Sequence, residues 1–403
     1  MLSEPYYQLD LVEPVSTVAA IPDPAPAVLP FLTAAGTAHE FSRCFVFSGT
    51  GKEYFRIWIV NLCLTIATAG IYSAWAKVRR LQYFHRSTAL AGAVFDFHGD
   101  PKAILKGRLV AVAVVTAYQY AFGFSRNVGI VVVTFLLLGL PWMLRSALCF
   151  RLRNTSYRGL RFGFDGSLGG AYLTWLPAAL IFFLPSILLA LFPTEPAWFG
   201  SSFALYLGWL VVHAQVKRYQ HSNFRYGSSN ASCRVSSWRI VLLYFWALLI
   251  GIGAMLVALV LTALLAFGLR AGGAGFGGAM LSWIPLGTAL VTGYGIYLLA
   301  WPYLYVRIHN RVWSSTTLPG IVIDSHLRAI GYIRMQTSNV ILTLLTCGLY
   351  RPFAVVRAYR YRLAMTTVIT TTSFEKLLSG EHKPTANTAG EGAADFLGID
   401  LSW

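Results

Sequence analysis

The sequence carries little charge, and its apolar part carries almost no acid. Charged residues make up 12% of the 403 residues and hydrophobic residues 56%, with a mean hydropathy of +0.58. Only six of the 16 acidic residues fall between residues 45 and 374, and none lies inside an apolar run. This composition excludes a soluble globular domain. The shortage of acids also disfavours a proton- or sodium-coupled transporter, because such proteins commonly place carboxylates at membrane depth.

The sequence also lacks the motifs of common catalytic and metal sites. It contains no His-Glu-x-x-His, no Walker-type phosphate loop and no Gly-x-Ser-x-Gly elbow. The five cysteines are odd in number and lack metal-binding spacing, so neither structural disulfides nor a bound metal is expected. No acid–base pair can be assembled near the apolar runs. We therefore predict a protein that is not an enzyme and has no cofactor.

Six apolar runs are long enough to cross a bilayer, which takes about 20 helical residues. Each is mostly Leu, Val, Ala, Ile and aromatics, and each is bounded by charge or by Gly and Pro. These runs predict an all-α polytopic membrane protein built from three transmembrane helical hairpins. The predicted spans cover residues 108–124, 127–147, 171–193, 199–216, 240–269 and 277–304.

The cations follow the ends of the apolar runs. Residues 45–374 hold 29 of the 32 Lys and Arg residues, mostly in the long connections around 77–108, 145–170, 217–239 and 305–337. The positive-inside rule therefore places these connections in the cytoplasm and the short ones outside. The net charge of +16 would also suit nucleic-acid binding. Because the cations track the membrane boundaries, we expect the lipid bilayer and its anionic headgroups as partners, and no nucleic acid.

The two ends of the chain differ from the apolar part. Residues 1–44 form a Pro/Ala-rich acidic tail that is expected to be disordered, and residues 375–403 form a flexible acidic tail. Residues 45–374 remain as the membrane domain. The first 40 residues have no basic start followed by a short apolar core and a cleavage site, so no cleaved signal peptide is predicted.

A hydrophobic segment near the start of the chain recurs near its end. Residues 61–83 and 339–361 align without a gap, and ten of the 23 positions are identical. Both place Asn, Thr and Gly in an apolar stretch, and membrane transporters are often built from such repeats. Basic residues flank the later segment on both sides. We therefore predict that residues 338–356, and by the repeat 55–76, enter and leave on the cytoplasmic side or lie shallowly in the membrane. The alternative is that both are ordinary spans.

A second spacing describes the connectors between the spans. Trp75, Trp142 and Trp209 recur every 67 residues near the ends of apolar segments. After the first two come Phe95-Asp-Phe97-His98-Gly99 and Phe162-Gly-Phe164-Asp165-Gly166, whose alternation predicts short cytoplasmic β-hairpins. The predicted unit is a hairpin of two spans followed by such a connector, and it occurs three times.

Two stretches at the start of the apolar part are distinctive. One runs from Phe47-Ser-Gly49-Thr-Gly51-Lys-Glu53-Tyr-Phe55 to Gly70-Ile-Tyr72-Ser-Ala-Trp75-Ala-Lys77-Val-Arg79, and the other is Phe95-Asp-Phe97-His98-Gly99-Asp100-Pro101. Together they resemble the YjgN-like family of bacterial inner-membrane proteins, over roughly residues 45–370. The resemblance implies a multi-pass protein of the bacterial inner membrane, and the family's biochemical role is unassigned. The chain departs from the family where Pro352 and Phe353 replace the Ala-Trp pair of the first copy.

Two functions from different classes fit these features. The first is a transporter or channel-like protein for a small neutral or anionic solute, in which the two related segments meet at depth. The second is a membrane scaffold or assembly factor whose basic connectors bind anionic lipids or a cytoplasmic partner. The polar residues in the apolar segments would then serve only as interhelical hydrogen-bonding groups.

The transport hypothesis assigns roles to specific side chains in both segments. The predicted pathway residues are Asn61, Thr65, Gly70, Tyr72, Asn339, Thr343, Gly348 and Tyr350. The predicted contacts to anions or lipid headgroups are Arg79, Arg80, Arg357 and Arg360.

Overall fold

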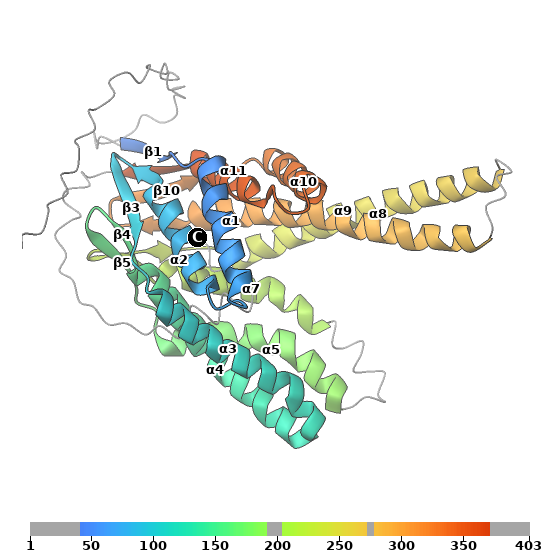
Figure 1. Ribbon diagram of the computed structural model, residues 1–403, viewed down its shortest axis with the longest axis horizontal. Coiled ribbons are helices and arrows are strands. Elements are labelled where there is room, and N and C mark those ends of the chain that lie inside the picture. Colours follow the sequence, from blue (N-terminus) through green and yellow to red (C-terminus); the bar gives the residue numbers. More distant parts are fainter. Residues whose placement is uncertain (1–40, 192–203, 272–277, 371–403) are drawn as a thin grey trace, which may run out of the picture. The chain divides into compact units, whose positions relative to one another are not determined.

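The computed structural model describes residues 41–191, 204–271 and 278–370, along which long helices alternate with short strands (Figure 1). The strands in these ranges form one antiparallel sheet of 11 strands. The predicted all-α fold class is therefore wrong. The sequence predicts separate β-hairpins in the connectors, but an isolated hairpin leaves its outer backbone groups unpaired and is only marginally stable. Pairing between successive connectors satisfies these groups, and no pattern within a single connector indicates it.

The described chain is organised as five units of the same plan, more than the three predicted. Each unit is a strand, a helical hairpin and a second strand, and its two strands pair antiparallel with each other. The first unit consists of β1 (Phe41–Phe47), α1 (Gly51–Ala67), α2 (Ser73–Arg86) and β2 (Thr88–Leu90). The second consists of β3 (Ala93–Phe97), α3 (Pro101–Phe124), α4 (Arg126–Arg153) and β4 (Thr155–Tyr157).

The other three units repeat this order with helices of different length. The third consists of β5 (Leu160–Phe164), α5 (Leu168–Leu191), α7 (Trp209–Ser222) and β6 (Phe224–Tyr226), followed by β7 (Ser229–Asn230). The fourth consists of β8 (Ser232–Cys233), α8 (Ser237–Ala271), α9 (Gly278–Trp313) and β9 (Thr316–Leu318). The fifth consists of β10 (Ile321–Ser325), α10 (Ala329–Leu345), α11 (Arg351–Ala364) and β11 (Thr366–Thr370). The segments aligned by sequence, 61–83 and 339–361, lie in the first and fifth units.

Recurring hydrogen bonds end the second helix of each unit. In four units the second strand begins with a threonine whose hydroxyl donates to the carbonyl four residues earlier, at 2.7 to 2.9 Å: Thr88, Thr155, Thr316 and Thr366. In the third unit the side-chain amide of Asn223 bonds the carbonyl of Tyr219 instead, at 2.8 Å. Such local side-chain bonds compete with helix continuation, and β-branched residues favour strands, so the chain changes conformation here.

The sheet nearly closes on itself. Its strand order is β7-β6-β5-β4-β3-β2-β1-β11-β10-β9-β8, so β1 and β11 join the two ends of the described chain. The outer strands β7 and β8 are separated in sequence by Ala231 alone. Of the predicted tails, residues 41–44 belong to β1, whereas residues 1–40 and 375–403 lie outside the described residues.

All five units contribute an apolar side chain to one cluster within the sheet. The cluster contains Leu90, Tyr157, Tyr226, Leu318 and Val368, one from each unit in order. The Tyr157 hydroxyl donates to the carbonyl of Leu90 at 2.6 Å, and the Tyr226 hydroxyl donates to the carbonyl of Tyr157 at 3.1 Å. Side chains from every unit thus pack the sheet together, and hydroxyl groups link consecutive units.

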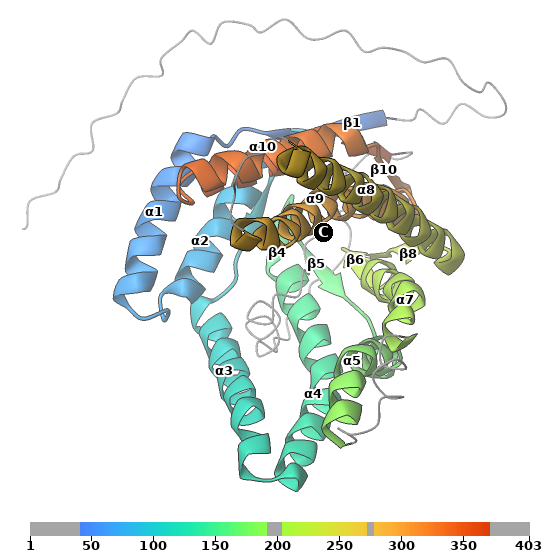
Figure 2. The same cartoon turned by 90° about the vertical axis from the view of Figure 1, so that its right-hand side faces the viewer.

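The helical hairpins extend from around the sheet (Figure 2). Among the described elements, each helix contacts the next one along the chain, and α11 contacts α1. The first and last units therefore touch through their helices as well as through β1 and β11. Arg360 donates to the carbonyl of Gly49 at 2.8 Å, and the rings of Phe55 and Phe353 stack at 5.6 Å.

Four helical stretches among the described residues have the length and apolarity to cross a membrane. They are Arg126–Arg153, Leu168–Pro185, Ser237–Leu264 and Gly287–Trp313. Each overlaps one predicted span. The predicted span 108–124 lies in α3, whose early turns contain Lys102, Lys106 and Arg108, and it is not among the four. The span 199–216 lies partly outside the described residues, so three complete transmembrane hairpins are not found.

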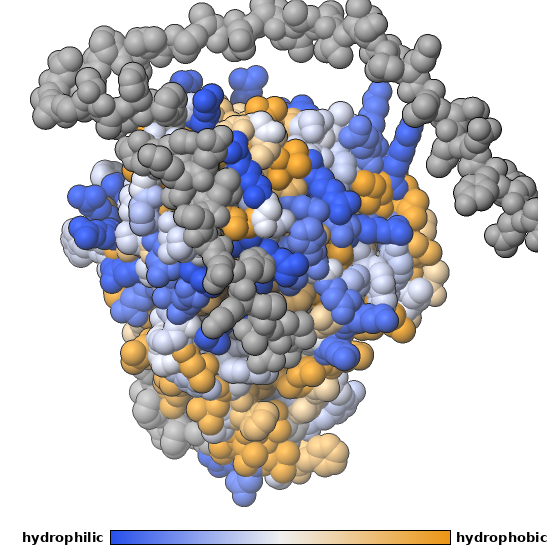
Figure 3. All heavy atoms as spheres, turned by 90° about the vertical axis from the view of Figure 1, so that its left-hand side faces the viewer, coloured by the Kyte–Doolittle hydropathy of each residue, from blue (hydrophilic) through white to orange (hydrophobic). Residues whose placement is uncertain are grey.

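The end of the molecule that carries the strands is more polar than the helices. Figure 3 looks onto this end and shows many hydrophilic side chains there, with hydrophobic ones gathered below. Exposed arginines on or beside the strands include Arg43, Arg86, Arg161 and Arg234. By contrast, α8 exposes a continuous series of Leu, Ile and Val side chains. This division fits helices in lipid and a sheet in water.

We predict that removing one linking hydroxyl weakens the sheet. Tyr157→Phe and Tyr226→Phe should each lower the free energy of unfolding by about 1 kcal/mol, because each removes one buried hydrogen bond between consecutive units. Thermal unfolding of the detergent-solubilised protein measures the change. Tyr294→Phe, on an exposed tyrosine of α9, is the matched control and should change nothing. Equal stability of all three variants would contradict the proposed linkage.

Candidate anion-binding site

A cavity of about 330 Å³ lies between the first unit, the start of α3 and the last unit. Its described lining includes four cations, Lys77, Arg80, Arg108 and Arg351, and no acid. Lys77 and Arg80 come from α2, Arg108 from α3 and Arg351 from the first residue of α11. The other lining residues are Tyr54, Trp58, Asn61, Leu62, Thr65, Ser73, Ala76, Pro352 and Val355.

Helical spacing places most of the lining on one face of α1 and one face of α2. Residues three or four apart share a helix face, and both sets follow that interval. The α1 set is Tyr54, Trp58, Asn61 and Thr65, and the α2 set is Ser73, Lys77 and Arg80. Arg108 donates a hydrogen bond to the Ser73 hydroxyl, which fixes the start of α3 against α2. Three separate units therefore contribute charge to the cavity.

The two faces meet because the chain reverses tightly between α1 and α2. Ala69 and Gly70 have φ values of 47° and 92°, in the left-handed region that glycine adopts most easily. The Gly70 amide donates to the carbonyl of Thr65 at 2.7 Å, which caps the end of α1. The Thr68 hydroxyl accepts from the amide of Tyr72 at 2.9 Å.

The turn between α10 and α11 has the same local geometry. Cys347 and Gly348 have φ values of 50° and 92°, and the Gly348 amide donates to the carbonyl of Thr343 at 2.7 Å. The Thr346 hydroxyl accepts from the amide of Tyr350 at 3.0 Å. In this structure Gly70 and Gly348 serve to reverse the chain, and Thr65 and Thr343 bond the carbonyls four residues earlier.

Asn61 and Asn339 are both buried, with 7% and 3% of their surface exposed. Each has a side-chain oxygen without a hydrogen-bond partner. The Asn339 nitrogen donates to the carbonyl of Ala354 at 3.5 Å, which joins α10 to α11. Asn61 lines the cavity, whereas Asn339 does not. Both oxygens are inaccessible to a water-sized molecule, so neither is exposed to the open space of the cavity.

A second, more open groove of about 700 Å³ lies along α10, α11 and the start of α1. It contains three arginines, and two of them bond nearby protein groups. Arg357 donates to the Ser338 hydroxyl at 2.9 Å, and Arg360 donates to the carbonyl of Gly49. Arg334 is the third. Most of the surface around them is apolar, so the smaller cavity concentrates charge more strongly.

Six of the 12 predicted site residues line the cavity or the groove. Asn61, Thr65 and Arg80 line the cavity, and Tyr350, Arg357 and Arg360 line the groove. The remaining predicted residues line neither: Gly70, Tyr72, Arg79, Asn339, Thr343 and Gly348. Arg79 lies 5.8 Å from the centre of the Tyr72 ring, in a cation–π contact.

Three cations of the cavity were missed by the sequence-based prediction. Lys77 lies three residues before Arg80, so helical spacing alone could have found it. Arg108 and Arg351 lie in other units, and only the packing of α3 and α11 brings them to the cavity. The corresponding residue of Arg351 in the first unit is Ser73, so comparing the two segments gives no signal for it.

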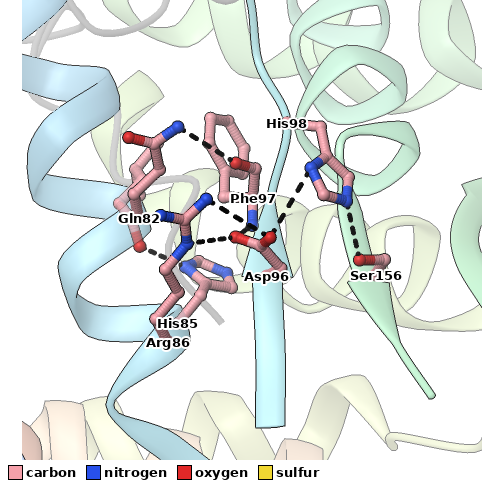
Figure 4. Close-up of polar contacts among 8 residues, drawn as sticks. Gln82, His85, Arg86, Asp96, Phe97, His98 and Ser156 are labelled. Carbon is pink, nitrogen blue, oxygen red and sulfur yellow. Dashed lines mark hydrogen bonds and ion pairs between the residues drawn. The ribbon is translucent and has the colours of Figure 1, made fainter. Parts of the chain in front are cut away.

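A polar network next to β3 has the residue types of a hydrolase triad (Figure 4). His98 lies 3.1 Å from the Ser156 hydroxyl and 3.7 Å from the Asp96 carboxylate. The second distance exceeds hydrogen-bond range, and Asp96 instead accepts from Arg86 at 2.8 Å. Burial raises the pKa of Asp96, but its hydrogen bonds from Arg86 and the backbone hold it below the ordinary value. The network thus connects three elements. Arg86 of α2 forms an ion pair with Asp96 of β3, and His98 lies beside this pair and contacts Ser156 of β4.

Four long apolar helices and a polar end that carries the strands define an integral membrane protein. Residues 42–396 match the model of a family described as a bacterial protein of unknown function (DUF898), and the chain belongs to this family. The predicted family resemblance is thereby confirmed. No solved structure matches the chain.

Named relatives have the same description in different bacteria. The inner membrane protein YjgN of Escherichia coli O157:H7 is 34% identical over 154 residues, which cover 36% of each chain. The inner membrane protein YjgN of Salmonella typhimurium is 24% identical over 375 residues, which cover 86% of this chain and 93% of the relative. The chain therefore matches about a third (36%) of the length of the E. coli protein. With the apolar helices, these relatives place the chain among inner-membrane proteins.

We predict that His85, beside this polar network, makes the fold sensitive to acid. Burial, with a smaller contribution from Arg151, lowers the pKa of His85 from 6.5 to about 4. Below pH 6.5 the unfolded chain therefore takes up a proton that the folded chain does not. The stabilisation is complete above pH 6.5 and falls as the pH drops towards 4, by about 2 kcal/mol at pH 5.

Unfolding of wild type and His85→Gln at pH 7.5 and pH 5 measures this effect. The variant should lose less stability than wild type on acidification, since its side chain does not titrate. If His85→Gln and wild type respond alike, the neutral buried state of His85 is refuted.

Proposed function

We propose that the protein is a non-enzymatic inner-membrane transporter that binds an anionic solute in the cavity between its first and last units. The main observation in support of this proposal is the lining of the cavity, which includes four cations and, among its described residues, no acid. Of the two solute classes compatible with the sequence, neutral and anionic, this lining favours the anionic one. The positive electrostatic potential of such a lining repels cations and raises the local concentration of anions.

The cations of the lining come from three units and share one cavity. Arg80 and Arg351 are exposed, whereas Lys77 and Arg108 are half-buried. An anion within reach of several of these side chains would accept charge-assisted hydrogen bonds, which are the stronger kind.

The position of the cavity supports transport rather than binding in water alone. The α1–α2 turn exposes Ile66 and Ile71, with 71% and 56% of their surface accessible. Such side chains are suited to lipid, and Lys77 and Arg80 lie only one to two helical turns from the start of α2. A cationic site would therefore lie close to the hydrocarbon. An unpaired anion is strongly disfavoured there, so an anion that enters this region needs the cations as partners.

We predict that Arg80→Gln and Arg351→Gln each weaken anion binding at least tenfold, since each removes a charged hydrogen-bond donor worth about 1.5–3 kcal/mol. The probe is radiolabelled glycerol 3-phosphate, measured for binding in detergent and for uptake into proteoliposomes. Arg161→Gln removes an exposed arginine of β5 that does not line the cavity, and it should bind like wild type. Wild-type binding by all three variants would remove the cavity from the proposed function.

The role of Asn61 has a separate test. Asn61→Leu should abolish uptake while the protein still inserts into the membrane, because a larger, apolar side chain replaces a polar residue of the lining and narrows the cavity. Membrane extraction and chromatography check the insertion. Full uptake by this variant would show that Asn61 is only a packing residue.

A second candidate function is a membrane scaffold that binds anionic lipids without moving a solute. One observation favours it: the apolar cluster from all five units fills the middle of the sheet. A solute could not follow the axis of the sheet without displacing these side chains. Uptake distinguishes the two functions, since a scaffold binds anions at the cavity but shows no flux across the vesicle membrane.

A further inference from the structure

We propose that the open groove along α10, α11 and the start of α1 binds one anionic phospholipid, with its phosphate among three arginines and its acyl chains towards the turn between α10 and α11. The groove is separate from the cation-lined cavity, because different residues of α11 line the two. Phe353 and Arg357 line the groove, whereas Arg351 and Val355 line the cavity. The inference therefore goes beyond the proposed function and does not depend on it.

The three arginines of the groove lie close together on two helices. Arg357 of α11 donates to the Ser338 hydroxyl at 2.9 Å, so its guanidinium group lies against α10. Arg334 precedes Ser338 by about one turn of α10, and Arg360 follows Arg357 by about one turn of α11. All three arginines are exposed and line the groove. A ligand in the groove can therefore reach cations from both of its walls.

No acid within the described ranges pairs with these arginines. Arg357 and Arg360 donate to uncharged groups, the Ser338 hydroxyl and the Gly49 carbonyl, which orient the side chains and leave their charge uncompensated. A guanidinium group has five donors, so both keep donors for a ligand, and paired donors suit phosphate oxygens. The five described acids bond to other groups: Glu53, Asp96, Asp100, Asp165 and Asp324.

The groove becomes apolar towards the turn between the two helices. Tyr350 and Phe353 line it at the start of α11, and their rings stack at 5.7 Å. The turn beyond them exposes Leu344, Leu345 and Leu349, with 66%, 76% and 51% of their surface accessible. A soluble phosphate leaves this apolar surface uncovered, whereas acyl chains cover it. The groove thus has a cationic end and an apolar end, which matches the polarity of a phospholipid.

The connections of the hairpin place its cationic end nearer the membrane surface. α10 has 17 residues, which is about 25 Å and shorter than the hydrocarbon core of about 30 Å. β10 precedes α10 and β11 follows α11, so both ends of the hairpin adjoin the sheet. The hairpin therefore enters the membrane from the side of the sheet and returns. Arg357 and Arg360 lie about 9 and 14 Å along α11 from its start at the turn, towards the headgroups that arginine side chains prefer.

The experiment compares two lipids that share acyl chains and differ in net charge. Full-length protein in detergent is titrated with phosphatidylglycerol and with phosphatidylcholine, and native mass spectrometry counts the bound lipids. Wild type should bind one phosphatidylglycerol at least tenfold more tightly than phosphatidylcholine, because the choline ammonium brings a positive charge to the arginines. This comparison needs no variant, so a folding defect cannot obscure it.

A triple variant then assigns the preference to the groove. Arg334→Gln, Arg357→Gln and Arg360→Gln combined should weaken the binding of phosphatidylglycerol at least tenfold and leave little difference between the two lipids, because the charged donors are lost. Glycerol 3-phosphate, the soluble probe of the cavity, should not displace the lipid from wild type, because it cannot cover the apolar end of the groove.

Two further variants serve as controls. Arg161→Gln, Arg234→Gln and Arg311→Gln combined remove the same charge from exposed arginines that do not line the groove, and lipid binding should stay as in wild type. Arg80→Gln combined with Arg351→Gln changes the cavity and should also keep the lipid, because the groove is intact.

Several outcomes would overturn the inference. Equal binding of the two lipids by wild type removes the preference for an anionic headgroup, and displacement by glycerol 3-phosphate shows a site for soluble anions. Loss of the lipid in the Arg80 and Arg351 variant places it in the cavity instead. A dimer that only the triple groove variant dissociates assigns the groove to a second copy of the chain. None of these results decides whether glycerol 3-phosphate binds at the cavity, so the proposed function keeps its own test.

Discussion

The structure depends on the need of short strands to pair their backbone groups. Each connector between helical hairpins contributes strands of only two to seven residues, and no such pair is stable alone. Side-by-side pairing of all the connectors among the described residues satisfies these groups in one sheet. The pairing of β1 with β11 then brings together parts of the chain that are more than 300 residues apart. This pairing is what makes the first and last units neighbours.

The candidate site follows from the pairing of β1 with β11. Asn61, Lys77 and Arg80 belong to the first unit, and Arg351 reaches the same cavity only because α11 packs against α1. The contact is reinforced by Arg360 at the carbonyl of Gly49 and by the stacked rings of Phe55 and Phe353. Gly51 has no side chain, and a Cβ there would lie 2.6 Å from the Phe353 ring. Close approach of the two units is therefore built into the residue types at their interface.

The sequence predicted local features better than their assembly. Apolar length indicated the long helices, and the turns at Gly70 and Gly348 lie within the two related segments that the sequence singled out. The sheet was missed because pairing partners such as Phe41 and Thr370 share no local pattern. For the site, Asn61 and Thr65 were predicted from the repeat as pathway residues and Arg80 as an anion or lipid contact, and the three line one cavity. Arg108 and Arg351 could not be predicted, since their positions are set by contacts between units.

Charge gathers at the interface between the first and last units. Cations from three units line one cavity, where α11 and α3 approach the first hairpin. Strand pairing between β1 and β11 and the apolar contacts around Tyr54 and Val356 hold the units together. In the proposed function an anion in this cavity would contact more than one unit, so by linkage its binding and the pairing of these units would favour each other. The proposed site and the contact between the two ends of the described chain would then be thermodynamically coupled.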